Sequence, residues 1–422
     1  MRPQTLIDLT RELIARVLRF DAPADAVVAQ YFRAQPKLGQ HDRQRLGDAV
    51  YALLRRKTLF EHWARNGQGA PDRRLALLAL SDEREFLAPA LSAEEARWLA
   101  ACMATLASPL PDEAVHNLPS WLAQALMAQC GDEQFHALAH ALLQPAPLDL
   151  RVNVLRCKRV QAEQALASVG IATEPTPYSP WGLRVQGKPD LRGLPLFQQG
   201  AIEAQDEGSQ LLALLLGARR GELVCDFCAG AGGKTLAIGA AMRSSGRLYA
   251  FDVSAQRLAE LKQRAARGGL THVYPAAIAP EVDERLARLA GKLDRVLVDA
   301  PCSGLGTLRR HPDLKWRQTP AAVAEFAVQQ RSILERAARL LKAGGTLVYA
   351  TCSLLTDENE AVAQAFTEGH ASFKPVAVSG LLGAQKIPQA GALCSADGRY
   401  LRLWPHRHQT DGFFAAAWQR LH

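Results

Sequence analysis

The chain has 422 residues, of which 48% are hydrophobic and 22% charged, and its formal net charge is +8. This length exceeds what one compact core holds and predicts two or three globular domains. The first twenty residues mix charged with apolar side chains, and no twenty-residue apolar span follows, which argues against a signal peptide or membrane anchor and favours the cytoplasm. The basic excess would attract a polyanion but equally suits a solvated surface, so charge alone leaves nucleic-acid binding open. Eight scattered cysteines indicate reduced thiols and not a disulfide framework.

The front of the chain is predicted to be helical. Only five of the 31 glycines lie in its first 140 residues, and Leu6, Leu13 and Val17 are among the apolar side chains that recur at helical spacing. Such a pattern is typical of amphipathic helices packed into a bundle. We therefore expect an all-helical domain over residues 1–145.

One stretch of this domain, GQHDRQRLGDAVYALLRR at residues 39–56, resembles the NusB-like RNA-binding domain found at the N-terminus of some RNA-modifying enzymes. The alternative is an ordinary helix with an arginine-rich exposed face. The two prolines of QPAPLD then indicate a linker at residues 144–149. After it, strand-like LRVNVLR, helical VQAEQALASV and strand-like WGLRVQG predict a small α+β linking module over residues 146–205.

The remainder, residues 206–422, alternates strand-like and helical segments, which predicts a mostly parallel sheet with helices on both faces. Near the end, RYLRLWP and DGFFAAAW are expected to form an antiparallel hairpin at the edge of this sheet. The predicted parallel strands are 223–227, 247–251, 294–298 and 346–350.

A glycine-rich turn, CAGAGGKT, joins the first of these strands to a helix. Gly230, Gly232 and Gly233 permit a tight turn and a close approach of backbone to ligand. Asp252 ends the next strand, twenty residues beyond Gly232, where a carboxylate can accept hydrogen bonds from both ribose hydroxyls. The pair predicts a nucleoside cofactor without separating NAD from S-adenosylmethionine, and the alternative is a structural turn beside a surface aspartate. Lys234 follows AGAGG and not the spacing of a Walker loop, which disfavours ATP.

Cys225 and Cys228 form a CxxC, but no second cysteine or histidine pair stands at zinc-site spacing. Cys225 also falls inside the predicted strand. We therefore expect no metal site.

Two further strand ends carry candidate catalytic residues. Asp299 ends the third strand, Cys302 follows it in a Pro-Cys-Ser turn, and Cys352 lies in a Thr-Cys-Ser turn after the fourth. Ligands of open α/β sheets gather outside the carboxyl ends of the strands, so the three side chains should share one crevice with the cofactor. A single cysteine at such a place is more often packing, whereas two beside an aspartate point to chemistry.

The motifs DFCAGAGGKT, DAPCSGLGTLRRHPDLKW, YATCS and DGFFAA match, in order, those of the Sun/RsmB family of RNA cytosine-C5 methyltransferases. The resemblance covers residues 150–422. Within the family, RRHPDLKW and the NusB-like front are most similar to members that modify small-subunit (16S) ribosomal RNA. The resemblance implies a Rossmann-like domain that uses S-adenosylmethionine, with RNA as the partner, and we expect a monomer.

The resemblance also implies the roles of the candidate residues. It assigns the nucleophile to Cys352; Asp299 would hydrogen-bond the base, and Cys302 would assist the loss of H5 or the release of Cys352. C5 of cytosine is a poor nucleophile until a thiolate adds to C6, which explains the need for a cysteine. The implied cofactor-binding residues are Cys228, Ala229, Gly230, Ala231, Gly232, Gly233, Lys234, Asp252 and Asp299.

This chain departs from the family pattern at two places. Ala231 stands where the usual loop has proline, a change that loosens the turn. In addition, THVYPAAIAPE offers alanines where an aspartate usually accepts from the adenine amino group, so we assign no residue to that contact.

A basic run with an aromatic residue inside it follows Cys302. Lysine and arginine suit phosphates, and a tryptophan can stack on an unpaired base, so we predict RNA contacts here; the alternative is a solvated helix face. The residues are Arg309, Arg310, His311, Lys315, Trp316 and Arg317.

Two other functions remain open at this point. A ribosome-assembly factor that binds RNA would use the same fold with secondary or lost catalysis, although Cys352, Cys302 and Asp252 are intact. A small-molecule methyltransferase or dehydrogenase would not need two strand-end cysteines beside a basic run.

Overall fold

The computed structural model describes residues 1–104, 110–279 and 283–422. The chain divides into two compact units. The first comprises Met1–Pro145 with Thr307–Thr319, and the second comprises Ala146–Gly306 with Pro320–His422. The segment Thr307–Thr319 therefore belongs to the helical unit, although in sequence it lies within the predicted catalytic domain.

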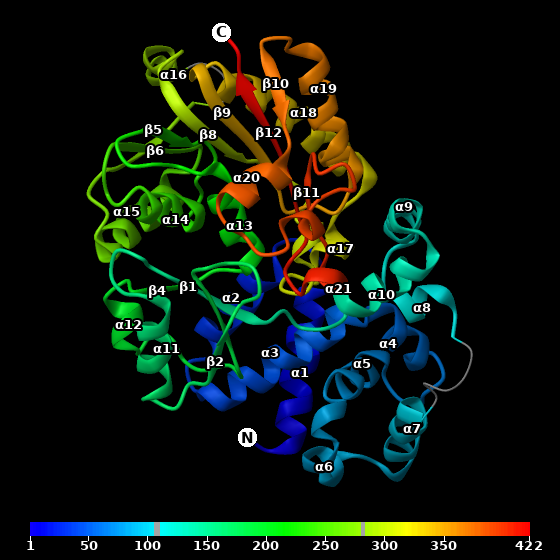
Figure 1. Ribbon diagram of the computed structural model, residues 1–422. Coiled ribbons are helices and arrows are strands. Elements are labelled where there is room, and N and C mark those ends of the chain that lie inside the picture. The colour runs from blue at the N-terminus through cyan, green and yellow to red at the C-terminus, as the bar shows by residue number, and fades with distance from the viewer. Residues whose placement is uncertain (105–109, 280–282) are drawn as a thin grey trace. The chain divides into compact units, whose positions relative to one another are not determined.

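The first unit is helical, as predicted (Figure 1). Its helices are amphipathic: Leu6, Leu13 and Val17 of α1 are buried, and so are Leu46 and Val50 of α3. The apolar stripes meet in one core. The helices are α1 Pro3–Val17, α2 Ala24–Ala34, α3 Gln40–Arg55, α4 Lys57–Ala64, α5 Pro71–Ala79, α6 Arg84–Leu87, α7 Ala93–Ala104, α8 Asp112–His116, α9 Ser120–Cys130, α10 Asp132–Leu142 and α17 Leu314–Arg317.

The second unit begins with a small antiparallel sheet in the order β2-β3-β1-β4. Leu150 and Val152 of its β1 are fully buried with Leu166 of α11, because alternate residues of a strand face the same side. The elements are β1 Leu148–Val152, α11 Arg159–Ala167, β2 Thr173–Pro175, β3 Gly182–Val185, α12 Pro195–Gln198 and β4 Ile202–Ala204.

A larger sheet follows in the order β10-β12-β9-β8-β5-β6-β7, with β11 paired to β12 (Figure 1). The four predicted parallel strands are all present, as β5, β6, β8 and β9, and their neighbouring pairs are parallel. The elements are α13 Glu207–Leu216, β5 Leu223–Asp226, α14 Gly233–Ala241, β6 Arg247–Asp252, α15 Ala255–Gly268, β7 Val273–Ala277, α16 Glu284–Leu289, β8 Leu293–Asp299, α18 Pro320–Ala338, β9 Leu341–Thr351, α19 Glu360–Gly369, β10 Phe373–Val376, α20 Val378–Ala384, β11 Leu401–Leu403, α21 Pro405–His408 and β12 Phe413–Arg420.

The predicted terminal hairpin is confirmed. β11 pairs antiparallel with β12, with Leu401 opposite Ala415. β12 pairs with β9 on one side, and on its other side with β11 over residues 413–415 and with β10 over residues 417–420. The hairpin therefore lies at the edge of the sheet, as predicted; the sequence analysis missed only β10 Phe373–Val376, a four-residue strand with an internal proline, which shares that edge.

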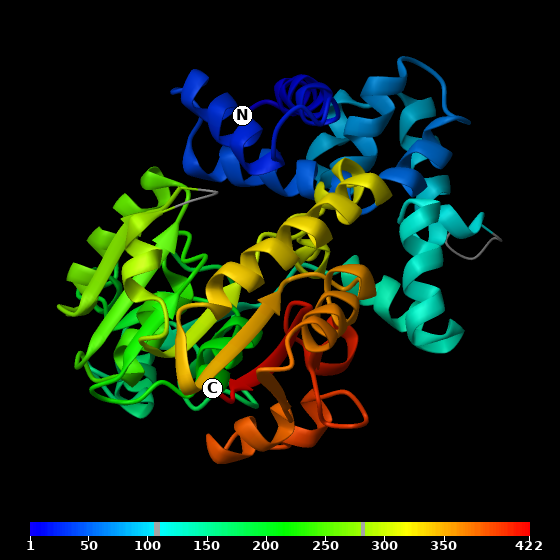
Figure 2. The ribbon, with the colours of Figure 1, turned by 90° about the horizontal axis from the view of Figure 1, so that it is seen from above.

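The central strands β5, β8 and β9 send alternate residues to two separate cores. On one face, Val224, Leu297 and Val348 pack with α13, α14 and α20. On the other, Val296 and Leu347 pack with α18 and α19, and α18 runs beside β9 (Figure 2). Helices on both faces leave the carboxyl ends of the strands as the place where loops gather.

In the described part of the chain, no helix is both long and apolar enough to cross a membrane.

Candidate active site

The glycine-rich loop follows β5 and is shaped by backbone geometry. Gly232 has a φ of 90° and is the residue before α14; a Cβ there would lie 2.1 Å from the Leu261 side chain. Gly230 also has a positive φ, of 53°. The backbone conformation at these two positions requires glycine. Because glycine has no side chain, the loop backbone is open to close approach by a ligand.

Asp252 ends β6 and faces this loop. Its Oδ2 accepts a hydrogen bond from the Gly230 N–H at 2.8 Å, and its Oδ1 accepts one from the Ser254 N–H at 2.8 Å. The carboxylate therefore fixes the loop and keeps one further lone pair on each oxygen for a ligand hydroxyl.

Asp299 ends β8 and is paired with the loop lysine. The Lys234 Nζ donates to Asp299 Oδ2 at 2.7 Å. Burial opposes the charged ammonium, but Asp299 outweighs it, so the pKa of Lys234 is raised. A charged pair thus stands at the strand end where the sequence predicted a base-binding carboxylate.

The two cysteines of the strand-end turns meet. The Cys302 and Cys352 Sγ atoms are 3.3 Å apart, and both residues are partly exposed. The hydrogen bond to Cys352 and burial raise the pKa of the Cys302 thiol well above its ordinary value. A thiol held in its protonated form is a poor nucleophile but can donate a hydrogen bond.

The loop, the two aspartates and the two cysteines line one cleft of about 370 Å³. They come from the carboxyl ends of four adjacent strands, in the order β9, β8, β5 and β6. The predicted cofactor and catalytic residues are therefore brought together: Cys228, Ala229, Gly230, Ala231, Gly232, Gly233, Lys234, Asp252, Asp299, Cys302 and Cys352 all line this cleft.

The two cysteines of the CxxC are free thiols. Burial raises the pKa of the Cys225 and Cys228 thiols well above the ordinary value. Across residues 1–104, 110–279 and 283–422, no three or more His, Cys, Asp or Glu side chains are grouped as a metal site.

Several residues of the cleft were missed by the sequence analysis. Asp226, at the end of β5, is 1% exposed, and its Oδ2 accepts from the Thr235 hydroxyl at 2.7 Å. Burial raises its pKa to about 7. The sequence signal that could have identified Asp226 is that it is the one acidic residue in the apolar run LVCDF. Gln205 and Ser209 also line the cleft, but they come from the region around α13, where no motif marked them.

The contact with adenine remains unassigned. β7 comprises Val273–Ala277, so Ala276 and Ala277 are its last two residues and Ile278 and Ala279 follow it, none of which offers a carboxylate. Pro280 and Glu281, the end of the stretch in question, lie outside the described residues.

The basic run after Cys302 belongs to the helical unit. The Lys315 Nζ donates to the Arg55 carbonyl at 2.8 Å, and the Trp316 Nε1 donates to the Leu54 carbonyl at 2.8 Å. Lys315 is 2% exposed, so its ammonium is not available to a phosphate in this conformation, contrary to the prediction. The other residues of the run, Arg309, Arg310, His311, Trp316 and Arg317, are partly exposed.

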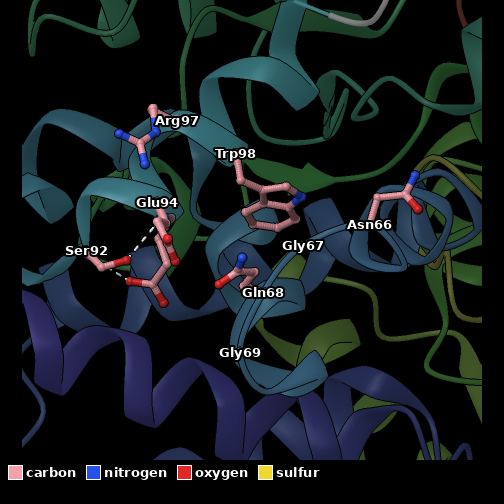
Figure 3. A pocket seen from close by; sticks show the side chains of 9 residues that line it. Asn66, Gly67, Gln68, Gly69, Ser92, Glu94, Arg97 and Trp98 are labelled. Carbon is pink, nitrogen blue, oxygen red and sulfur yellow. Dashed lines mark hydrogen bonds between the residues drawn. The ribbon is translucent and has the colours of Figure 1, made fainter.

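A second hollow, of about 510 Å³, lies in the helical unit beside the Trp98 ring (Figure 3). Its other lining residues come from the loop Asn66–Gly69 and from the start of α7. No predicted cofactor or catalytic residue lines it.

The sheet, with its antiparallel β12 between β9 and β10, is that of the Rossmann-like S-adenosylmethionine methyltransferase fold. The family model described as 16S rRNA methyltransferase RsmB/F matches residues 213–419. A second model, the ferredoxin-like domain of RsmF/B-like methyltransferases, matches residues 118–192 and so begins before the small sheet, two residues ahead of α9. The chain belongs to the RsmB/RsmF methyltransferase family.

Relatives and solved structures agree with this placement. The chain is 36% identical to a probable ribosomal RNA small subunit methyltransferase B of Synechocystis, over 71% of this chain and 66% of that protein. It is 35% identical to the corresponding Bacillus subtilis protein, over 72% and 66%. The matches therefore span slightly less than two thirds of these relatives.

Among solved structures, that of PH0851 covers 100% of this chain and 99% of its own, with a TM-score of 0.77 and 24% identity, a likeness of fold. A methyltransferase homologue from Pyrococcus horikoshii covers 73% of this chain and 97% of its own, with a TM-score of 0.61 and 28% identity.

Proposed function

We propose that this protein is an S-adenosylmethionine-dependent RNA methyltransferase that methylates C5 of cytosine, with small-subunit ribosomal RNA as its substrate. The observation that carries the proposal is the single cleft in which two thiols, 3.3 Å apart, stand beside the glycine loop and Asp252. A dehydrogenase or a small-molecule methyltransferase has no use for that thiol pair. The family relatives named as small-subunit rRNA methyltransferases support the choice of RNA.

The cleft fits the proposed cofactor. Gly230 and Gly232 hold the loop open where any Cβ would be strained, and Asp252 keeps lone pairs for a ribose diol. When bound, S-adenosylmethionine supplies an electrophilic methyl carbon.

The chain's own residues prepare the base. The Cys352 thiolate adds to C6, and the C5=C6 electron pair moves to C5, which makes C5 the nucleophile for the methyl carbon that bound S-adenosylmethionine would supply. Asp299, held by Lys234 at 2.7 Å, accepts from the exocyclic edge of the base and orients it. Loss of the C5 proton to water returns the electron pair to the ring and expels Cys352 from C6 as a thiolate. The Cys302 thiol lies 3.3 Å away, is kept protonated by its high pKa, and can donate a hydrogen bond to the departing sulfur.

The experiment separates the two cysteines. Cys302→Ala should form the adduct and fail to resolve it, giving a protein–RNA band that survives denaturing electrophoresis. The band should vanish in the Cys302→Ala, Cys352→Ala double variant, and Cys352→Ala alone should lose methyl transfer. Cys394→Ala, a partly buried cysteine outside the cleft, is the matched control.

Other outcomes point elsewhere. If Cys352→Ala is the variant that traps RNA, the nucleophile is Cys302. If the wild-type protein binds ribosomal RNA but transfers no labelled methyl group to it, the chain is an assembly factor that has kept the fold. Digestion of the product to nucleosides identifies 5-methylcytidine.

We further propose that the helical unit recognises the RNA as a NusB-like domain. The support is the α3 stretch at residues 39–56 and the partly exposed arginines of the basic run, Arg309, Arg310 and Arg317. Trp316 and His311 complete this proposed surface. Lys315 is buried and is not part of it. We expect the protein to act as a cytoplasmic monomer.

A further inference from the structure

A buried carboxylate lies directly behind the two cysteine turns. Glu358 is 0% exposed although it stands in the acidic sequence TDENE. Its Oε1 accepts from the Ser303 N–H at 2.8 Å and from Gln330 Nε2 at 3.0 Å. Its Oε2 accepts from the hydroxyls of Ser303 and Ser353, both at 2.5 Å. Four donors therefore satisfy one buried charge, which would otherwise be very costly to bury.

The two serines are the residues that follow the two cysteines. Ser303 comes directly after Cys302, and Ser353 directly after Cys352. The serine hydroxyls lie 3.2 Å apart and the cysteine sulfurs 3.3 Å apart. Glu358 thus joins two turns that are fifty residues apart in the chain, at the same place where their sulfurs meet.

Neighbouring side chains brace the same junction. Gln330 of α18 also donates to the Pro301 carbonyl at 2.9 Å. Asn359 donates to the Ser353 carbonyl at 3.0 Å and accepts from the Thr351 hydroxyl at 2.5 Å. Both turns are therefore tied on both sides of their cysteines, and Glu358 is bonded to a serine side chain of each turn.

We propose that Glu358 is the positioning residue that sets the spacing of the two thiols. The inference rests on the proposed two-cysteine reaction, in which Cys302 must reach the sulfur that Cys352 presents to C6. Glu358 lies behind the turns and acts through Ser303 and Ser353. Its reach and its acceptor geometry matter, because the two oxygens must meet donors from both turns at once.

The first test measures the spacing without using the methyl-transfer activity. Diamide takes two electrons and two protons from a pair of neighbouring thiols and leaves a disulfide, which mass spectrometry of the linked peptides detects. The wild-type protein should cross-link Cys302 to Cys352 rapidly. Glu358→Asp, which keeps the charge but is one methylene shorter, should cross-link about tenfold more slowly or worse, because the thiols lose their mutual alignment. Ser353→Ala removes only one oxygen and should also lower the cross-linking rate. It keeps the test valid if Glu358→Asp fails to fold.

The matched control is Glu360→Gln. Glu360 is two residues away and partly buried, and it pairs with Arg402 at 2.9 Å, not with the cysteine turns. It should cross-link at the wild-type rate. If Glu358→Asp and Ser353→Ala also cross-link at that rate, the proposal is overturned, whatever the activity of the protein proves to be.

The second test uses turnover and separates reach from charge. Glu358→Asp should lower kcat on the order of 10²-fold with little change in KM for RNA, since misplacement by about an ångström is costly to a reaction but not to binding. Glu358→Gln keeps the reach and retains the Oε1 acceptor, so it should be faster than Glu358→Asp. The opposite order would show that charge and not position is what the site requires, and would refute the assignment.

The serines should then fail differently. Ser303→Ala loosens the turn of Cys302 and should accumulate some covalent protein–RNA adduct, whereas Ser353→Ala loosens the turn of the nucleophile and should slow adduct formation. Identical effects of both variants on both steps would contradict the proposal. A wild-type protein without methyltransferase activity would sink the proposed function alone, because the cross-linking result would still stand.

Discussion

Replacing Asp252 with alanine should weaken S-adenosylmethionine binding while leaving the sheet intact. Each carboxylate oxygen accepts one backbone N–H at 2.8 Å, from Gly230 and from Ser254, and keeps one lone pair for a ribose hydroxyl. Hydrogen bonds to a charged acceptor contribute about 1.5–3 kcal/mol each, so losing two, with water replacing part of the loss, should cost about 3 kcal/mol. That corresponds to a rise in Kd on the order of 10²-fold, which isothermal titration calorimetry measures directly.

The matched control is Asp294→Ala. This aspartate lies at the start of β8, accepts from the Leu223 N–H at 2.8 Å and pairs with Lys342, but it does not line the cleft. It should lower stability by an amount similar to Asp252→Ala and leave the Kd unchanged. An Asp252→Ala protein that binds the cofactor as tightly as this control would refute the ribose assignment.

Three further predictions concern buried charges. Because burial raises the pKa of Asp226 from 3.8 to about 7, the folded state holds a proton that the unfolded state releases, so stability should fall as pH rises from about 4 to 7. Asp226→Asn should remove that fall, which between pH 5 and pH 8 is on the order of 3 kcal/mol, in urea titrations without cofactor at those two pH values. Burial lowers the pKa of Lys315, so the unfolded state binds a proton that the folded state releases, and the free energy of unfolding should rise with pH. Lys315→Met removes this burial cost and should raise the melting temperature more at pH 6 than at pH 10. It should do so although the variant loses the hydrogen bond to the Arg55 carbonyl. Asp313→Ala removes the buried acceptor of the Ala24 N–H at the start of α2 and should destabilise the helical unit by about 1 kcal/mol, seen as reduced amide-exchange protection of that helix.

The parts of the fold that the sequence predicted are those whose signals are local. β5, β6, β8 and β9 are short apolar runs between turns, and a parallel sheet buried on both faces requires that pattern. The position of the candidate site could be predicted from these strands, because residues at the carboxyl ends of adjacent parallel strands lie at the same edge of the sheet. Asp252, Asp299 and Cys352 could therefore be assigned to one cleft without any knowledge of their distances.

The parts that it did not predict depend on partners distant in the chain. Lys315 and Trp316 bond to α3 residues 260 and 262 positions away, and nothing in a basic run with one tryptophan distinguishes that docking from RNA binding. Glu358 reads as part of a solvated acidic stretch, because its donors lie on three separate segments. A buried charge is recognised only when its partners are known, which explains why the cysteines were found and the residue behind them was not.

The glycine-rich loop shows how tertiary contacts can compensate for a departure from a family pattern. Ala231 lacks the φ restriction of the usual proline, and the sequence alone indicated a looser turn. In the structure, Arg264 Nη1 donates to the Ala231 carbonyl at 2.6 Å, and its Nη2 donates to Glu203 at 2.9 Å, a carboxylate that Arg267 also contacts. The next residue of the loop, Gly232, packs against Leu261 of the same helix, α15. A proline would restrict this loop through its own ring. Here the Arg264 guanidinium, which is anchored on Glu203 of β4, and the Leu261 side chain, one turn of α15 away, restrict it instead. The loop is therefore held by tertiary contacts and not by its own sequence.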